Sequence, residues 1–122
     1  MARSPSTSKS VANPLLYVLM NTMVASVRSD TTDLTARQLA VFLKVYLEPS
    51  IEHTVRGLAE QLNVSKPAIT RALDRLEELD FAKRASDPKD RRSVNVRRTG
   101  TGSAYLRALG GYMLAASKQL KK

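Results

Sequence analysis

Residues 54–96 decide the fold, and they read TVRGLAEQLNVSKPAITRALDRLEELDFAKRASDPKDRRSVNV. The first half of this stretch predicts two short helices. Thr54 and Ser65 are residue types that cap helix N-termini. Asn63 lies between the two helices and is one of the few residue types that tolerates the left-handed backbone of a tight turn. The apolar residues of the second helix recur with helical spacing, and they are Ile69, Ala72, Leu73, Leu76 and Leu79.

The second half predicts a β-hairpin with a basic tip. Phe81–Ala85 and Ser93–Arg97 are the strand candidates, and the charged, turn-forming residues 87–92 separate them. Within the second strand Val94 and Val96 alternate with polar residues, which predicts one buried face. A helix pair followed by such a hairpin describes a winged helix-turn-helix.

The polar residues of the second helix form its predicted outer face. They are Lys66, Pro67, Thr70, Arg71, Asp74 and Arg75. A helix in the major groove of DNA needs side chains there that reach base edges or phosphates. Ser65 and the free N–H groups beside it would add a phosphate site at the helix N-terminus. A purely solvated face, with the arginines paired to Asp74 and Glu78, is the alternative that the pattern leaves open.

Outside this stretch the sequence predicts an arm and three further helices. Residues 1–13 are Ser-rich and have no apolar period, so we expect a disordered basic arm without a secretory signal. Asn13 followed by Pro14 predicts a helix start. Thr35 and Gln38 fit a capping box at the start of another helix, and the last helix begins at Thr99.

The expected organisation is one winged-helix domain over residues 14–122. Its core would be residues 34–99, flanked by dimerisation helices at 14–29 and 100–122. The fold class is therefore mainly α with a small β-hairpin.

Leu15–Val27 is apolar around most of a helical circumference, and it is too short to span a membrane. Such a helix must be buried on several sides, so we expect a second copy of the chain to cover it. The residues expected at this homodimer interface come from the first and last helices: Leu15, Leu16, Leu19, Met23, Tyr105, Leu109, Tyr112, Met113 and Ala116.

Composition narrows the function. The chain has 122 residues, no cysteine, one histidine and a formal net charge of +9. The absence of cysteine excludes disulfides and thiolate zinc sites, and a single histidine argues against a metal site or a Ser-His triad. With no Gly-rich phosphate loop or nucleophile–base pair, we expect neither an enzyme nor a cofactor. A small, strongly basic domain instead predicts a polyanionic partner.

At this point the sequence resembles the MarR-type transcriptional regulators. The match covers about residues 34–99, and its most specific part is the hairpin tip, 87–94. The matching motifs are Leu34-Thr35-x-x-Gln38, Leu58-Ala59-Glu60-Gln61-Leu62, Ser65–Glu77 and Asp87-Pro88-Lys89-Asp90-Arg91-Arg92-Ser93-Val94.

The resemblance implies that Ser65–Glu77 enters the major groove of double-stranded DNA and that Arg92 enters the adjacent minor groove. Arg92 belongs to the hairpin of residues 81–97, which is the wing of this fold. Asp90 would orient Arg92, with Lys89 and Arg91 beside it. A narrow minor groove concentrates negative potential and attracts a guanidinium. The DNA-binding residues expected on all these grounds are Ser65, Lys66, Pro67, Thr70, Arg71, Arg75, Lys89, Arg91 and Arg92.

Three features depart from the family pattern. Asp80 stands where the family often has Gly, and residues 99–102, Thr-Gly-Thr-Gly, are a variant of the usual Leu-Thr-x-x-Gly start of the last helix. One helix follows the wing where the family usually has two. We therefore expect a shortened C-terminal dimerisation region.

The leading hypothesis is a sequence-specific regulator that binds double-stranded DNA as a homodimer in the bacterial cytoplasm, associated with the nucleoid. No membrane partner is expected, and a small-molecule effector is conceivable without being indicated. Two alternatives stay open: a protein-interaction module built on the same fold, and a nucleoid-type DNA binder with little sequence preference.

Overall fold

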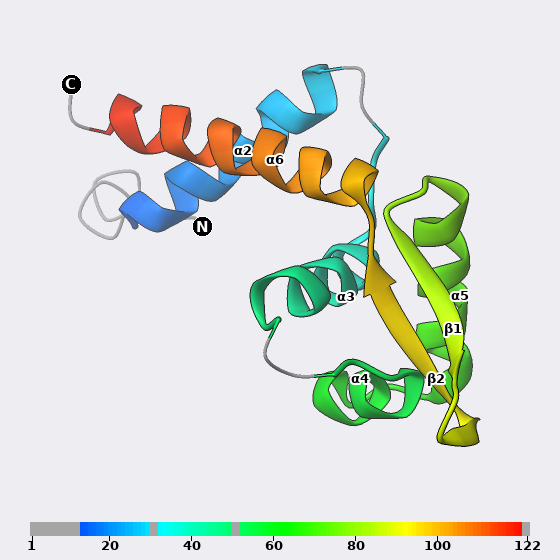
Figure 1. Cartoon of the computed structure of the whole chain (residues 1–122). Coiled ribbons are helices and arrows are strands. Elements are labelled where there is room, and N and C mark those ends of the chain that lie inside the picture. The colour runs from blue at the N-terminus through cyan, green and yellow to red at the C-terminus, as the bar shows by residue number, and fades with distance from the viewer. Residues whose placement is uncertain (1–12, 30–31, 50–51, 121–122) are drawn as a thin grey trace. The chain divides into compact units, whose positions relative to one another are not determined.

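The computed structural model describes residues 13–29, 32–49 and 52–120. In these ranges the chain forms five helices and one antiparallel hairpin (Figure 1). Their bounds are α2 (Pro14–Arg28), α3 (Ala36–Leu47), α4 (Val55–Leu62), α5 (Lys66–Glu78), β1 (Ala82–Asp87), β2 (Asp90–Arg98) and α6 (Gly100–Gln119). The fold class predicted from the sequence is confirmed. The arm expected at residues 1–13 lies outside the described residues except for Asn13.

The described residues belong to two units. One is 34–106, which holds α3, α4, α5, the hairpin and the start of α6. The other combines the described parts of 1–33 and 107–122, which are α2 and the rest of α6.

The helix starts follow the predicted caps. Thr35 Oγ1 accepts a hydrogen bond from the Gln38 N–H (3.1 Å), and Gln38 Oε1 accepts one from the Thr35 N–H (2.9 Å), which completes the capping box. Thr54 Oγ1 accepts from the Gly57 N–H at 2.9 Å. Asn63 adopts φ 56° and ψ 47°, the left-handed conformation predicted for the turn between α4 and α5.

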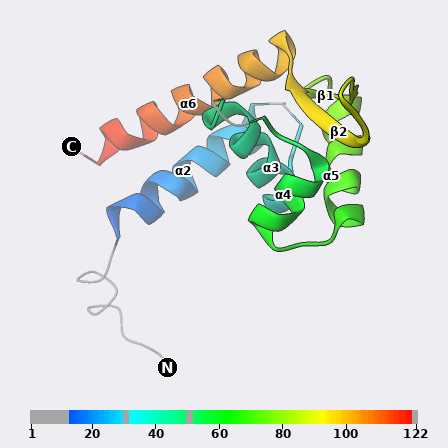
Figure 2. The same cartoon turned by 60° about the horizontal axis from the view of Figure 1, so that its bottom comes forward.

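The core of the 34–106 unit joins α3, α4, α5 and the hairpin. Phe42 is its centre: its ring stacks on Tyr46 at 4.3 Å and meets Tyr105 edge-on at 5.3 Å. Phe81 stacks on Tyr105 at 4.6 Å. Leu58, Ile69, Leu73 and Leu76 are completely buried against this cluster. This packing holds α5 and the hairpin in one unit. Figure 2 shows the two lying side by side.

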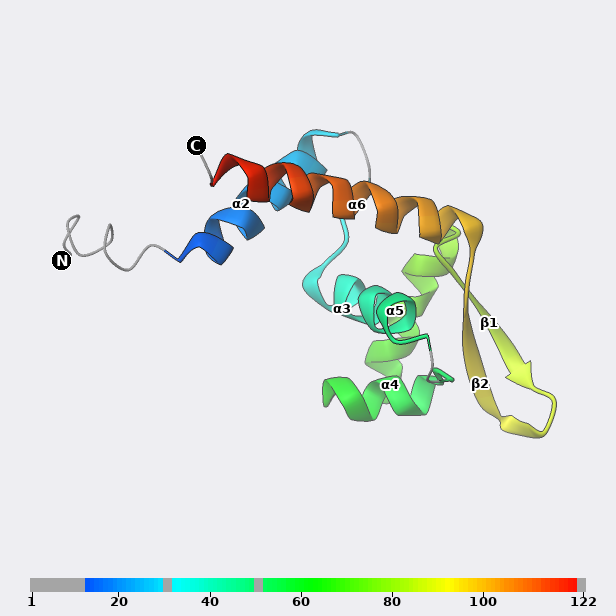
Figure 3. The ribbon, with the colours of Figure 1, turned by 60° about the vertical axis from the view of Figure 1, so that its left-hand side comes forward.

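The strands are longer than predicted, and this corrects the sequence interpretation. Pairing continues to Asp87 and resumes at Asp90, so the turn consists of Pro88 and Lys89 rather than residues 87–92. The Lys89 N–H donates to Asp87 Oδ1 at 2.9 Å across this turn. The charged residues at the tip are exposed, so they do not oppose backbone pairing. The hairpin projects from the helices (Figure 3).

Asn95 also differs from the expectation of one buried face. It is 3% exposed although it alternates with the buried Val96. The cause is the segment before α4: Thr54 forms an isolated bridge with Asn95, and the Val96 N–H donates to the His53 carbonyl at 2.8 Å. This segment covers the strand from the side, and the period-2 pattern contains no sign of it.

The α2 helix has a reversed distribution of polarity. Its buried residues are Val18, Thr22 and Ser26. Apolar side chains face solvent instead, namely Leu15, Leu16, Tyr17, Leu19, Met20, Val24 and Val27. None of the described helices is long and apolar enough to cross a membrane.

Candidate nucleic-acid interface

The α5 helix divides cleanly into an inner and an outer face. Ala68, Ile69, Ala72, Leu73 and Leu76 are buried. Of the six residues predicted to face outward, five are exposed, and Arg75 is half-buried with Nη1 3.0 Å from Glu78 Oε1. The five are Lys66, Pro67, Thr70, Arg71 and Asp74. The sequence therefore located the solvent-facing surface of α5.

The N-terminus of α5 is capped by its own chain. Ser65 Oγ accepts from the Ala68 N–H at 3.2 Å, and Pro67 has no N–H. In the described structure the Lys66 N–H is the donor of this turn that is left for a phosphate. The phosphate site expected beside Ser65 therefore has fewer free N–H donors than the sequence suggested.

The tip of the wing carries the residues that the family pattern singles out. Asp90 Oδ1 accepts from the Arg92 N–H at 3.1 Å and lies 3.7 Å from Arg92 Nε. The Arg92 side chain is 96% exposed, and Lys89 and Arg91 are exposed as well. Asp90 thus contacts Arg92 without burying it, which leaves the guanidinium free to reach another molecule.

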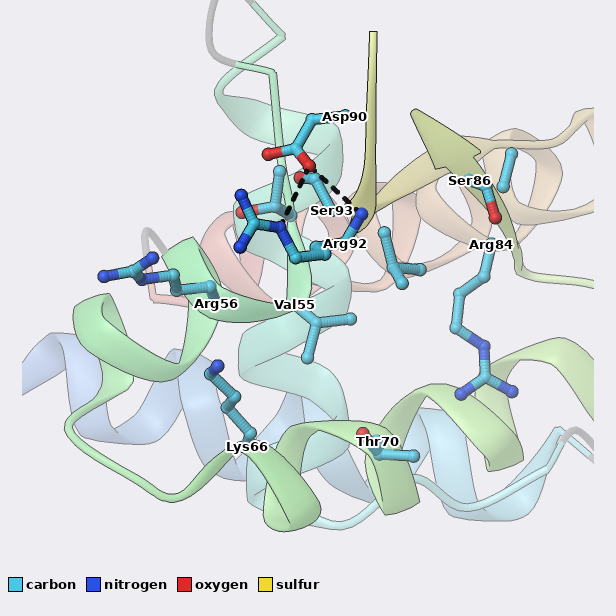
Figure 4. Close-up of a pocket in the computed structure, with 12 residues that line it drawn as sticks. Val55, Arg56, Lys66, Thr70, Arg84, Ser86, Asp90, Arg92 and Ser93 are labelled. Atoms are coloured by element: carbon cyan, nitrogen blue, oxygen red, sulfur yellow. Dashed lines mark hydrogen bonds and ion pairs between the residues drawn. The ribbon is translucent and has the colours of Figure 1, made fainter. Parts of the chain in front are cut away.

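A groove of about 780 Å³ lies between the wing, α5 and the start of α4 (Figure 4). Its lining comes from residues 54–56, from Lys66 and Thr70, and from residues 84–86, 90 and 92–94. The structure therefore brings four of the predicted residues to one groove: Lys66, Thr70, Asp90 and Arg92. The other predicted DNA-binding residues lie outside its lining, namely Ser65, Pro67, Arg71, Arg75, Lys89 and Arg91.

Positive charge dominates this groove. Arg56, Lys66 and Arg92 line it, with Asp90 as the acidic residue among the lining. Arg84 lines it too, but its guanidinium is bound to Asp74 and Glu77. The Arg56 side chain is mostly exposed, and its Nε lies 3.9 Å from Glu60 Oε2, which makes a loose ion pair in solvent. A concave surface lined with cations of this kind suits a row of phosphates.

Sequence reasoning missed Arg56 and Arg84. Arg56 follows the N-cap Thr54 in α4, and only the packing of α4 against the wing brings it to the groove. Arg84 binds two carboxylates of α5, since Nη2 lies 2.6 Å from Glu77 Oε1 and 2.7 Å from Asp74 Oδ1. The alternative left open by the sequence, a pairing of Asp74 and Glu78 with the arginines of α5, holds for Glu78 with Arg75 and not for Asp74.

The residues expected at the dimer interface differ in exposure. Leu15, Leu16, Leu19 and Met113 are exposed. Met23 and Tyr112 are half-buried. Leu109 and Ala116 are buried within one chain, and the ring of Tyr105 packs against Phe42 and Phe81. The exposed apolar side chains of α2 and α6 are therefore mainly leucine and methionine.

Within the described ranges, no group of three or more His, Cys, Asp or Glu side chains is arranged to hold a metal ion.

Comparison with known proteins adds a family match. The model of the MarR family matches residues 34–94, which include α3, α4, α5, β1 and the first half of β2. A comparison with curated protein sequences gives no match.

Solved structures are similar over almost the whole chain. The transcriptional regulator Tm0710 from Thermotoga maritima has a TM-score of 0.75 at 19% identity, covering 96% of this chain and 79% of that chain. A mutant MepR from S. aureus bound to an oligodeoxyribonucleotide has a TM-score of 0.77 at 18% identity, covering 98% and 83%. The heme sensor protein PefR from Streptococcus agalactiae, in complex with heme, has a TM-score of 0.69 at 16% identity, covering 98% and 80%. These likenesses concern the winged-helix fold.

Proposed function

This chain belongs to the MarR family and has the winged-helix fold of its transcriptional regulators, and on that premise we propose that it binds specific sequences in double-stranded DNA as a homodimer. The observation that carries the proposal is the cationic groove between α5 and the wing, with exposed side chains on both walls. A regulator of this kind acts in the cytoplasm, on the DNA of the nucleoid.

In the proposed complex α5 enters the major groove and the wing enters the neighbouring minor groove. Thr70 and Arg71 face the bases, because they lie on the exposed side of α5 beyond its first turn. Lys66 and Arg56 contact the phosphates that run between the two grooves. Arg92, held by Asp90, enters the minor groove.

The proposed dimer rests on the exposed apolar residues of α2 and α6. Large exposed apolar patches on a domain of this size mark interaction sites, and Leu15, Leu16 and Leu19 are each more than half exposed. Two-fold symmetry would then place two α5 helices about 34–36 Å apart, one turn of DNA, so the preferred site would be an inverted repeat. The likeness to PefR concerns fold, and we propose no effector.

Removal of the Arg92 side chain tests the wing. With a site obtained by selection from random duplex DNA, Arg92→Ala should weaken binding about tenfold at an unchanged unfolding temperature, because this side chain makes no contact that the fold needs. Arg97→Ala is the matched control, since it removes the same charge from the exposed part of β2 outside the groove. Equal affinities of wild type and Arg92→Ala would refute the wing assignment.

Competition and salt separate the proposal from its two alternatives. A sequence-specific regulator should be displaced from the selected site far better by that site than by unrelated duplex DNA, whereas a nucleoid-type binder would be displaced equally by both. Phosphate-driven binding should fall steeply between about 50 and 200 mM salt. Failure to bind any duplex at low salt would favour a protein-interaction module.

A further inference from the structure

Arg84 is the centre of a hydrogen-bonded junction between the wing and α5. Its Nε lies 2.9 Å from Glu77 Oε1, and its Nη2 lies 2.6 Å from the same oxygen and 2.7 Å from Asp74 Oδ1. Its backbone N–H donates to Glu77 Oε2 at 3.0 Å. Both the main chain and the side chain of one strand residue are thus bound to the neighbouring helix.

This junction differs from an ordinary surface ion pair. The Arg84 side chain is only 24% exposed and that of Glu77 only 32%, so the pair is partly withdrawn from solvent. The guanidinium offers several donors in a fixed plane, and here they reach carboxylates one helical turn apart on α5. Such a fork fixes an orientation as well as a distance.

The position of the junction along the hairpin lets it set the direction of the tip. Among the described residues, the hydrogen bonds of Arg84 are those between β1 and α5 that lie nearest the tip. Beyond it the ladder consists of the pairs Ala85–Asn95, Ser86–Val94 and Asp87–Asp90, and then the turn. A free two-stranded hairpin is marginally ordered in water, so the direction of the tip depends on where each strand is last held. The β2 strand is held at Asn95 by its bridge to Thr54, and β1 is held to α5 at Arg84.

We propose that Arg84 is a positioning residue for DNA recognition: by binding Asp74 and Glu77 it fixes the wing relative to α5, so that Arg92 reaches the minor groove while α5 occupies the major groove. This inference rests on the proposed function. Arg84 lies in β1 and binds α5, so it links the two elements that face the DNA. It acts by positioning Arg92 and does not itself contact a base.

The junction has a second consequence for charge. Asp74 and Glu77 lie on α5, close to where phosphates would approach, and carboxylates in that place repel DNA. Arg84 compensates both of them. Loss of Arg84 therefore lowers affinity by repulsion as well as by misplacing the wing, and the experiment must separate the two effects.

A double-mutant cycle separates them. In the wild-type background Arg92→Ala should weaken binding to the selected site about tenfold. In the Arg84→Gln background the same change should cost about twofold or less, because a misplaced wing has already lost the contact. Lys83→Gln is the matched control: it removes the same charge from the adjacent, exposed residue of β1 and should preserve the full effect of Arg92→Ala.

Two chemical footprints give an independent readout, because hydroxyl radicals attack the deoxyribose from the minor groove and dimethyl sulfate methylates guanine N7 in the major groove. Arg84→Gln should lose protection in the minor groove beside each half-site while it keeps protection around the major groove contacted by α5. A purely electrostatic role would weaken both protections together, and this would overturn the proposal. Persistence of the full tenfold effect of Arg92→Ala in the Arg84→Gln background would overturn it as well.

Two further variants cover a failure to fold. If circular dichroism shows Arg84→Gln unfolded, Arg84→Lys and Glu77→Gln provide the test. Arg84→Lys keeps the charge but loses the planar fork, so it should keep the wild-type salt dependence and lose part of the coupling to Arg92. Glu77→Gln should reduce the coupling in the same direction. If the wild type binds no duplex, or if Arg92→Ala does not weaken its binding, the proposed function fails. If Arg92→Ala weakens binding tenfold in both the wild-type and the Arg84→Gln backgrounds, only the inference about Arg84 fails.

Discussion

At the scale of single residues, Tyr46 and Gly102 determine how α6 begins. The Tyr46 hydroxyl donates to the Phe81 carbonyl at 2.7 Å and accepts from the Thr99 N–H at 3.0 Å. It therefore joins α3, the segment before β1 and the start of α6. A Cβ on Gly102 would collide with this hydroxyl and with the Phe81 carbonyl. Position 102 therefore requires Gly, because Tyr46 and Phe81 approach its backbone closely. This position corresponds to the Gly of the family's Thr-x-x-Gly pattern.

Gly102→Ala tests this close approach. We expect it to lower the free energy of unfolding by about 1–3 kcal/mol, the usual cost of overpacking a filled site. Gly100→Ala is the matched control, because it lies in the same helical turn with nothing within 4 Å of its Cβ position, and its effect should stay below about 0.5 kcal/mol. Urea unfolding followed by circular dichroism measures both. An equal cost for the two variants would contradict the role of Gly102.

Asp80 explains one departure from the family pattern. Its φ of 60° is left-handed, a conformation that Gly adopts without strain and Asp tolerates better than most residues. The side chain also makes a contact that Gly could not make, since Thr101 Oγ1 donates to Asp80 Oδ2 at 2.9 Å. The turn keeps the backbone shape expected for Gly, and the added bond ties it to the start of α6.

At the scale of elements, the junction between α5 and β1 connects stability to pH. The backbone N–H of Arg84 and then its guanidinium hold the pKa of Glu77 below its ordinary value. A carboxylate whose pKa is lower in the folded state stabilises the fold at pH values above its ordinary pKa. This contribution is lost as the pH falls through the lower, folded-state pKa.

Glu77→Gln should therefore be less stable than the wild type at pH 7, and the difference should shrink as the pH falls below about 4. Thermal unfolding of both proteins between pH 3 and pH 7 measures it. Glu60→Gln is the control, because Glu60 is 73% exposed and loosely paired with Arg56, and its difference from wild type should stay small throughout. A difference for Glu77→Gln that grows on acidification would contradict the assignment.

At the scale of the whole molecule, apolar exposure and charge point to two kinds of partner. The formal net charge of +9 favours a polyanion, while the outward leucines of α2 favour an apolar surface. The proposed homodimer that binds DNA accounts for both, because α2 and α6 would pack against a second copy and the cationic groove would bind DNA.

Leu19→Glu tests the dimer. Leu19 is 53% exposed in one chain, so a charge there should leave the fold intact and disrupt an interface that needs it buried. Sedimentation should give a dimer for the wild type, twice 13.5 kDa, and a monomer for Leu19→Glu. Leu47→Glu is the control, since Leu47 is 62% exposed at the end of α3 and should leave the dimer unchanged. A wild type that sediments as a monomer at micromolar concentration would refute the proposed interface.

Most of the secondary structure could be predicted from the sequence. Thr35, Thr54, Asn63 and Ser65 act as expected, because a cap or a left-handed turn depends on neighbours within three or four residues. The exposed face of α5 followed from helical periodicity for the same reason. The strand ends were less predictable, since charged residues at an exposed tip can pair as well as turn.

The sequence by itself determined the element order, the winged-helix class and the residues that α5 and the wing present to solvent. Only the tertiary structure decided that Arg56 joins the groove, that Arg84 binds Asp74 and Glu77, and that Asn95 is buried. Each of these contacts joins parts of the chain that lie apart in the sequence: Arg84 is 7 positions from Glu77 and 10 from Asp74. A sequence pattern reports the periodicity within one helix or strand. Contacts between elements depend on how the elements pack, and on which charged side chains packing brings close to one another.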